Sequence, residues 1–418
     1  MASPWVEITG RGVVSCAGLD VAAFQNAILA GEGHIKPFDE NGRELNLPPE
    51  FMAGLKLRFT RGAPVIGFDP TQHFEPRVLA GLDRFSQFAA VAARQAWKEA
   101  GFDVAPPVAD RIAVIVGTAN AGNESVGQGW QRILLEGRKP VPLTIPMTMA
   151  SGASSRIARE TGAHGPVFAT SSACASAAHA ILMGVMMLRS GLADVALVGG
   201  SDACYDFGYL RAWDALRVVT TDICRPFSKG RLGMSIGEGA AMFVLETTDH
   251  ARARGAPALA RLAGGGMTSD AGDLTTPDGR GMVRALHAAL RDSGLTPERI
   301  GYINAHGTGT QINDRLEAQA IREVFGAATD KLPVSTIKSS IGHAMGASGA
   351  LELVAAIATL ESGIAPPTLN YLEPDPDCPI DAIPEGPRKV NPEAVLSNSF
   401  AFGGLNVTLA LTRADVNL

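Results

Sequence analysis

The sequence predicts an α/β fold in which helices alternate with buried, mostly parallel strands. Short apolar runs rich in β-branched residues alternate with segments whose apolar residues recur every three or four positions. The same order of elements occurs in both halves of the 418-residue chain, without a residue-level repeat. Apolar residues make up 46% of the chain and charged residues 19%, which is typical of a large packed globule.

The elements of the first half are bounded by glycines and by changes of composition. The helical pattern around Trp97 stops at Gly101, and an earlier one stops at Gly31, because glycine commonly follows a helix. Residues 36–74 are rich in proline, glycine and charge and predict a long surface excursion. In chain order we expect a strand over 6–14, helices over 21–31 and 81–100, a strand over 111–117, a helix over 174–192, and strands over 194–199 and 242–246.

The second half repeats this order, and Gly294 and Gly326 end two of its helical patterns. The sequence therefore predicts two domains, 1–250 and 251–418, with reactive residues where a strand gives way to a helix, the place where open α/β sheets bind ligands. We expect a helix over 283–292, a strand over 300–305, a helix over 314–325, a strand over 332–337, a helix over 346–360, and strands over 395–400 and 407–412.

The bulk composition excludes several classes of protein. A net charge of −6 argues against a nucleic-acid binder, and no apolar run approaches the length of a membrane span. Glu7 and Arg11 interrupt the first apolar runs, so the N-terminus does not resemble a signal peptide. The five cysteines are scattered without metal-ligand or disulfide spacing, which predicts no bound metal, a reducing compartment and a cytoplasmic protein.

Cys174 stands where a short β-type run changes into an alanine-rich helical pattern. The unpaired N–H groups and the dipole of a helix N-terminus favour an anion, so this position predicts a thiol that loses its proton readily and acts as a nucleophile. A free cysteine also commonly packs as a small hydrophobe, and this segment alone leaves both interpretations open. We interpret His179, five residues further on, as structural, because it would face away from the sulfur.

Two loops of the second half carry histidines among small residues. His306 directly follows a predicted strand, and Thr308 and Thr310 add two hydroxyls to its loop. Lys338 and His343 lie where another predicted strand leads into a Gly/Ser-rich helix start. A cysteine, two histidines and a lysine at strand ends fit a nucleophile with groups that manage a proton and an oxyanion.

The segment 398–406 contains a Phe-Gly-Gly turn at residues 402–404. Such a turn allows backbone N–H groups to point at an oxyanion. Taken alone, the segment is equally compatible with an ordinary glycine-rich hairpin.

In combination, these segments resemble the condensing enzymes of the thiolase superfamily, specifically the elongating β-ketoacyl-[acyl carrier protein] synthases and type II polyketide ketosynthases. The resemblance covers nearly the whole chain. It implies a thiolase-like fold of two pseudo-duplicated halves in a five-layered αβαβα sandwich. The segments that carry it are 8–15, 83–89, 167–181, 225–229, 237–240, 304–310, 335–349 and 398–406.

The resemblance also implies a reaction and a role for each site residue. The reaction is a decarboxylative Claisen condensation of a cysteine-bound acyl group with malonyl-[acyl carrier protein], with no bound cofactor and with substrates carried on phosphopantetheine. Cys174 carries the acyl group, His306 and His343 bind the malonyl carbonyl, and Lys338 supports them. The N–H groups of Cys174 and Phe402 form the oxyanion hole, and the Phe402 side chain also opens and closes the acyl pocket. The resemblance implies supporting roles for Glu352, Asp314 and Phe400. It implies contact with the substrate for Thr308, Thr310, Asp270, Gly403 and Gly404.

The chain departs from the family pattern near the acyl pocket. Asn120 falls where fatty-acid elongators carry a small or aliphatic residue, and an amide in an alkyl pocket costs free energy unless it is paired. Our hypothesis is a specialised synthase whose acyl substrate is polar, unsaturated, aryl-bearing or unusually shaped.

The family works with acidic acyl carrier proteins and forms dimers. We therefore expect a local basic patch on this acidic chain and either a homodimer or a heterodimer with a related ketosynthase-like or chain-length subunit. Arg138 and Lys139 match a carrier-docking site of the family, and Arg77 and Arg225 are further candidates.

Two other functions remain open alternatives. A non-catalytic chain-length subunit is disfavoured because Cys174, His306, His343 and Lys338 are all present, although a catalytic subunit of a heterodimer fits. A thiolase would need a second catalytic cysteine, and Cys378 lies in an unsuitable Pro/Asp-rich run. The acyl chain, the pathway and the cognate carrier protein are left open by the sequence.

Overall fold

The computed structural model describes residues 5–38 and 56–416. Ten strands of this part of the chain form one hydrogen-bonded sheet in the order β10-β9-β13-β14-β8-β1-β7-β6-β4-β5. Its two five-stranded halves are joined where residues 6–8 of β1 pair with residues 260–262 of β8. The first half consists of β1 (Val6–Ser15), β4 (Ile112–Gly117), β5 (Val167–Thr170), β6 (Val195–Asp202) and β7 (Gly239–Thr247), and the second of β8 (Ala260–Ser269), β9 (Ile300–Asn304), β10 (Val334–Ser335), β13 (Ala394–Ala401) and β14 (Leu405–Thr412).

The two halves of the sheet enclose a central pair of helices, α8 (Ser176–Arg189) and α14 (Ser348–Ser362). Helix α8 packs on β4 and β6 of the first half and on β14 of the second, while α14 packs on β13, β7 and α8. Residues 348–360 of α14 are all buried, as expected for a helix that is apolar all round and has protein on every side.

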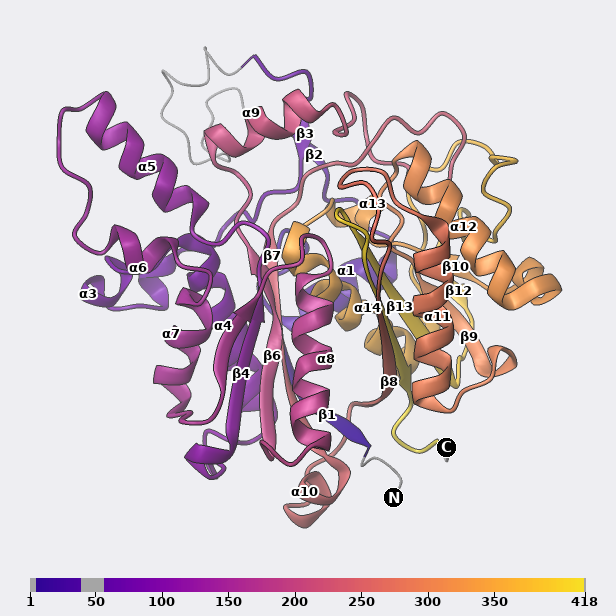
Figure 1. The fold of residues 1–418 in the computed structure, drawn as a ribbon, viewed down its shortest axis with the longest axis horizontal. Coiled ribbons are helices and arrows are strands. Elements are labelled where there is room, and N and C mark those ends of the chain that lie inside the picture. The colour runs from indigo at the N-terminus through magenta and orange to yellow at the C-terminus, as the bar shows by residue number, and fades with distance from the viewer. Residues whose placement is uncertain (1–4, 39–55, 417–418) are drawn as a thin grey trace.

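Outer helices complete the five layers expected from the resemblance (Figure 1). Helices α4 (Arg84–Glu99) and α7 (Gly152–Thr161) cover the first half of the sheet, and α11 (Gly279–Ser293) and α12 (Gln311–Phe325) lie on the far side of the second. The predicted αβαβα order is therefore present. The division of the chain at residue 250 stays a prediction.

The expectation of mostly parallel strands is wrong, because five of the nine pairings in the main sheet are antiparallel. Strand β4 is parallel to β5 and β6, and β9 is parallel to β10 and β13, but the other pairs of the main sheet are antiparallel. The residues between β13 and β14 form a short turn, and a turn of that length joins only antiparallel strands. Strand β8 was not predicted, because its three consecutive glycines at 264–266 weaken the strand pattern.

Most predicted helices lie within a few residues of their expected bounds. Helix α1 (Val21–Ala30) begins after Asp20, whose side chain accepts the Ala23 N–H, and it ends at Gly31 with φ 73°. Helices between residues 123 and 161 and at 207–216 were not predicted. The remaining elements are β2 (Lys36–Pro37), β3 (Arg61–Gly62), α3 (Pro76–Leu79), α5 (Asn123–Leu134), α6 (Thr144–Thr148), α9 (Phe207–Leu216), α10 (Thr248–Ala253), α13 (Lys338–Ile341), β11 (Ile364–Ala365) and β12 (Arg388–Lys389).

Two further expectations from the sequence were a long surface excursion over residues 36–74 and the absence of a membrane span. Part of the predicted excursion over 36–74 lies outside the described residues, and the described remainder contains the short β2–β3 pair. None of the helices in the described ranges is long and apolar enough to span a bilayer.

Candidate active site

Cys174 lies in a tight loop between β5 and α8, two residues before the helix begins. Ala173, directly before it, has φ 49°, a left-handed conformation that is uncommon for a residue with a side chain. The Ser176 hydroxyl holds the loop, because it donates to the Ala173 carbonyl (2.6 Å) and accepts the Ser172 N–H (2.9 Å). The start of α8 approaches the sheet closely, since a Cβ on Gly117 would lie 2.3 Å from the Ser176 backbone.

His343 lies directly against the thiol. Its Nε2 is 3.1 Å from Cys174 Sγ, and the Met345 N–H donates to its Nδ1 at 3.2 Å. Because Nδ1 accepts a backbone proton, the neutral ring carries its own proton on Nε2. His343 therefore presents an N–H donor at the position of the sulfur.

His306 is fixed in the same tautomer by Lys338. The Lys338 Nζ lies 3.2 Å from His306 Nδ1, donates to the His306 carbonyl at 2.7 Å, and forms an ion pair with Glu352. An ammonium group only donates, so His306 Nδ1 accepts and Nε2 carries the proton. All three side chains are buried, and the two imidazole rings meet edge-to-face with centroids 5.5 Å apart.

Burial dominates the electrostatics of these groups. It lowers the pKa of His306 and of His343 well below the ordinary value, and the Lys338 charge acts in the same direction, so both rings are neutral at physiological pH. Burial also raises the pKa of the Glu352 carboxyl to about 7, against the charge of Lys338.

The predicted ready loss of the Cys174 proton is not what the structure indicates. Burial raises the pKa of the thiol to about 11, and the charge of Lys338 and the N–H groups of Phe402 and Cys174 offset only part of that rise. The sulfur of the free protein is thus a neutral thiol. The oxyanion-hole role expected for these two N–H groups stays a prediction.

Two carboxylates that the sequence analysis did not single out hold the catalytic loops. Glu317 on α12 accepts the N–H groups of His306 and Gly307, each at 2.8 Å. Asp202, at the end of β6, accepts the N–H of Asn120 at 3.1 Å and that of Gly346, close to His343, at 2.6 Å. Glu317 lies three residues after Asp314, on the same face of the helix, and this spacing is the feature of the sequence that could have identified it.

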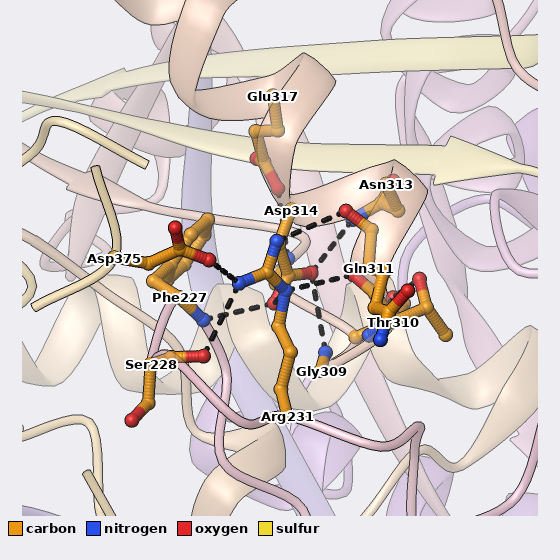
Figure 2. A network of polar contacts seen from close by, with 12 residues as sticks. Phe227, Ser228, Arg231, Gly309, Thr310, Gln311, Asn313, Asp314, Glu317 and Asp375 are labelled. Atoms are coloured by element: carbon orange, nitrogen blue, oxygen red, sulfur yellow. Dashed lines mark hydrogen bonds and ion pairs between the residues drawn. The ribbon is translucent and has the colours of Figure 1, made fainter. Parts of the chain in front are cut away.

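Asp314 organises the wall of the site beside Thr310 (Figure 2). It is fully buried and accepts the N–H groups of Phe227 (2.9 Å) and Gly309 (3.2 Å). Arg231 lies 3.6 Å from the Asp314 carboxylate and donates to the Thr310 carbonyl at 3.2 Å. This network fixes the loop that carries Thr308 and Thr310, which is consistent with the supporting role expected for Asp314.

A cavity of about 540 Å³ leads to the sulfur. Predicted site residues form much of its lining, together with residues of α9 such as Trp213 that sequence reasoning missed. The predicted residues that line it are Cys174, His306, His343, Thr308, Thr310, Phe400, Phe402, Gly403 and Gly404.

Asn120 and Asp270 are absent from the described lining of this cavity. The Asn120 amide lies 3.6 Å from Cys204 Sγ, behind the loop that Asp202 holds. Asp270 accepts the Asn406 amide (2.7 Å) and the Asp278 N–H (2.8 Å), so it ties a neighbouring loop to the turn after Phe402. Their predicted contact with substrate stays a prediction.

The basic residues predicted to dock a carrier protein lie on three segments, and none is among the described residues that line the cavity. Arg138 and Lys139 are exposed in the loop between α5 and α6, and Arg77 is exposed on α3. Arg225 is the least accessible, because its side chain is 12% exposed and pairs with Asp222.

The cysteine and the two histidines also have the spacing of a metal site. Sγ of Cys174 and a ring nitrogen of each histidine lie within 4.8 Å of one another, a spacing that ligand atoms of one metal ion can have. Nδ1 of His306, however, faces the ammonium of Lys338, whose charge opposes a further cation. The arrangement is better suited to a polarised carbonyl oxygen.

Comparison with known proteins gives one consistent family. The family model described as beta-ketoacyl synthase, N-terminal domain, matches residues 4–251, and the C-terminal domain model matches residues 259–372. The chain is 43% identical to nodulation protein E of Rhizobium leguminosarum bv. trifolii over 97% of this chain and 98% of the relative. It is 36% identical to 3-oxoacyl-[acyl-carrier-protein] synthase 2 of Coxiella burnetii over 98% of both chains.

Solved structures agree with this result. The ishigamide ketosynthase/chain length factor superposes with a TM-score of 0.90 at 33% identity, over 99% of this chain and 100% of the other. A type II polyketide acyl carrier protein in complex with its ketosynthase bound to the hexaketide gives a TM-score of 0.89 at 29% identity, over the same shares.

Proposed function

Since the chain belongs to the β-ketoacyl synthase family, we propose that Cys174, His306 and His343 carry out its reaction. The protein is an acyltransferase that condenses a cysteine-bound acyl group with malonyl-[acyl carrier protein] and forms β-ketoacyl-[acyl carrier protein]. The observation that carries the residue assignment is the convergence of two neutral imidazoles, each able to donate a hydrogen bond, on the sulfur of Cys174.

The first half-reaction loads the acyl group. Cys174 Sγ attacks the thioester carbonyl of the acyl carrier, and the N–H groups of Cys174 and Phe402 stabilise the oxyanion. The phosphopantetheine thiol leaves and takes up the proton that Cys174 gives up. One thioester replaces another, so this step is close to thermoneutral.

The second half-reaction forms the carbon–carbon bond. The His306 and His343 N–H groups polarise the malonyl thioester carbonyl, the bond to the carboxylate breaks, and carbon dioxide leaves. The enolate carbon then attacks the acyl carbonyl on Cys174, and the cysteine departs as the thiolate, which takes up a proton from solvent to restore the neutral thiol. Because both histidines are neutral donors, they stabilise the enolate oxygen without giving up a proton.

The partners follow from the substrates and from the relatives. We propose an acyl carrier protein that docks on Arg138 and Lys139, and a dimer with a second copy or a ketosynthase-like subunit. A solved relative is a ketosynthase/chain length factor, and another is seen with its carrier protein. A cytoplasmic location is also proposed, because all five cysteines are free and Cys174 acts as a thiol.

The acyl substrate is proposed to be specialised. The polar groups of Asn120 and Cys204 lie next to each other, and at the acyl-chain position expected for Asn120 they would replace the apolar contacts that a saturated chain needs. The comparison is compatible with a specialised substrate, because proteins of similar length in this family carry different names, among them a nodulation protein and a 3-oxoacyl synthase.

The reaction itself is tested by incubating the protein with an acyl-[acyl carrier protein] and malonyl-[acyl carrier protein]. Mass spectrometry of the carrier should show a β-ketoacyl chain two carbons longer than the primer, together with carbon dioxide in equal amount. Cys174→Ala should form none of this product. Product formation by Cys174→Ala at the wild-type rate would overturn the assignment.

A further inference from the structure

The ring of Phe402 is held from one side by Trp213. The two ring centroids lie 6.2 Å apart with an interplanar angle of 26°, a stacked arrangement, and both rings line the cavity above Cys174. Trp213 comes from α9, which is far from β13 and β14 in sequence. Such an aromatic pair is specific in geometry as well as apolar.

The turn that carries Phe402 does not fix that residue by itself. Gly403 and Gly404 follow with φ 82° and 66°, conformations that glycine adopts readily and that give the backbone several alternatives. Phe402 and Cys174 line the same cavity, and the Phe402 N–H acts to lower the pKa of that thiol. The neighbouring loop holds the backbone of the turn, because the Gly403 N–H donates to the Leu274 carbonyl (2.7 Å) and the Asp270 N–H donates to the Gly404 carbonyl (2.9 Å). The stacked Trp213 ring is the described contact that holds the Phe402 side chain itself.

Helix α9 is a rigid support for that contact, because both of its ends are anchored. At its start, the Asp206 carboxylate accepts the Tyr209 N–H (3.1 Å) and the Asn123 amide (3.4 Å). Near its end, the Asp214 carboxylate accepts Nε of Arg58 at 3.1 Å. Tyr209 packs edge-to-face against the Trp213 ring, with centroids 5.8 Å apart, from the side of a second cavity.

We propose that Trp213 is a positioning residue that holds Phe402, and with it the Phe402 N–H, at the acyl-transfer site. This inference rests on the proposed role of Cys174 as the acyl carrier. It predicts that Trp213 acts on loading of the acyl group, where the Phe402 N–H is used. The decarboxylation step depends instead on His306 and His343, which Trp213 does not contact among the interactions described.

The test compares the two half-reactions in the full-length protein. In Trp213→Leu, which keeps apolar bulk without a ring, the rate of Cys174 acylation by an acyl-[acyl carrier protein] should fall by up to about tenfold, the factor that one aromatic pair supplies. The rate of malonyl-[acyl carrier protein] decarboxylation should stay within about twofold. Trp213→Phe should restore most of the acylation rate, and Trp97→Leu, the same kind of substitution on the outer helix α4 away from the cavity, is the matched control.

A second measurement does not depend on rates. The fluorescence difference between wild type and Trp213→Phe isolates Trp213 from the other three tryptophans and should change when Cys174 becomes acylated. An equal fall of both half-reactions in Trp213→Leu, or an unchanged acylation rate, would overturn the inference. If wild type is not acylated on Cys174 at all, it is the proposed function that fails.

Discussion

The ammonium group of Lys338 lies 3.2 Å from Nδ1 of His306 and thereby decides which nitrogen of that ring carries the proton. The Met345 N–H does the same for His343. Both imidazoles are thus preset as N–H donors, and burial keeps them neutral. An enzyme that must stabilise an enolate needs such donors in place before the charge develops.

Removing one of these donors should separate the two half-reactions. In His306→Ala, malonyl decarboxylation and overall condensation should fall about 10²- to 10³-fold, as for loss of one preorganised donor. Acylation of Cys174 should change by only a few-fold, because the oxyanion of that step faces the Phe402 and Cys174 N–H groups. His287→Ala, at an exposed position of α11, is the control. Equal losses in both steps would contradict this division of roles.

The protonation of the free thiol predicts a pH profile for alkylation. Burial raises the pKa of Cys174 to about 11, so between pH 7 and 9 the thiolate is a minor form that grows tenfold with each pH unit. The rate constant for inactivation by iodoacetamide should rise by about that factor per unit over this range. Cys174→Ala corrects for labelling of other cysteines. A plateau below pH 8 would show instead a thiol with a lowered pKa.

Asn120 should influence which acyl chains are accepted. Asn120→Ile removes the amide beside Cys204 and should raise kcat/KM for saturated medium-chain acyl carriers by several-fold, since an amide whose partner is the weakly accepting Cys204 sulfur costs free energy next to an alkyl chain. The ratio to an aryl-bearing acyl carrier, measured on the same variant, is the control for general effects. An unchanged ratio would place Asn120 outside the acyl pocket.

Carrier docking on the loop between α5 and α6 predicts an effect limited to protein-bound substrates. The double variant Arg138→Glu and Lys139→Glu should raise KM for malonyl-[acyl carrier protein] about tenfold or more and leave small thioester analogues unaffected. The double variant Lys389→Glu and Arg291→Glu, at exposed residues of the short strand β12 and of helix α11, is the charge-matched control. The docking assignment fails if both kinds of substrate lose activity equally.

Much of the site was predictable because its reactive side chains lie in short segments at the ends of strands. Cys174, His306, Lys338, His343 and Phe402 lie in glycine- and serine-rich loops whose residue types are unusual. The structure brings the cysteine and both histidines within 4.8 Å of one another. The helix start itself was placed two residues early, because α8 begins at Ser176.

What the sequence did not reveal depends on contacts between distant segments. In the sequence, Glu317 is indistinguishable from the other acidic residues of an amphipathic helix. Its contact with the backbone of the His306 loop forms only when the chain folds. Trp213 likewise belongs to a helix that was not predicted, and its contact with Phe402 joins residues far apart in the chain. The rise in the Cys174 pKa depends on complete burial, which overrides the local effect of a helix start.

The most direct test of the central claim is intact and peptide mass spectrometry after incubation with an acyl-[acyl carrier protein] alone. The account predicts a stoichiometric mass increase equal to one acyl group, located on the peptide that contains Cys174, and its absence in Cys174→Ala. An acyl group on another residue, or no acyl-protein in conditions where the carrier is consumed, would contradict it.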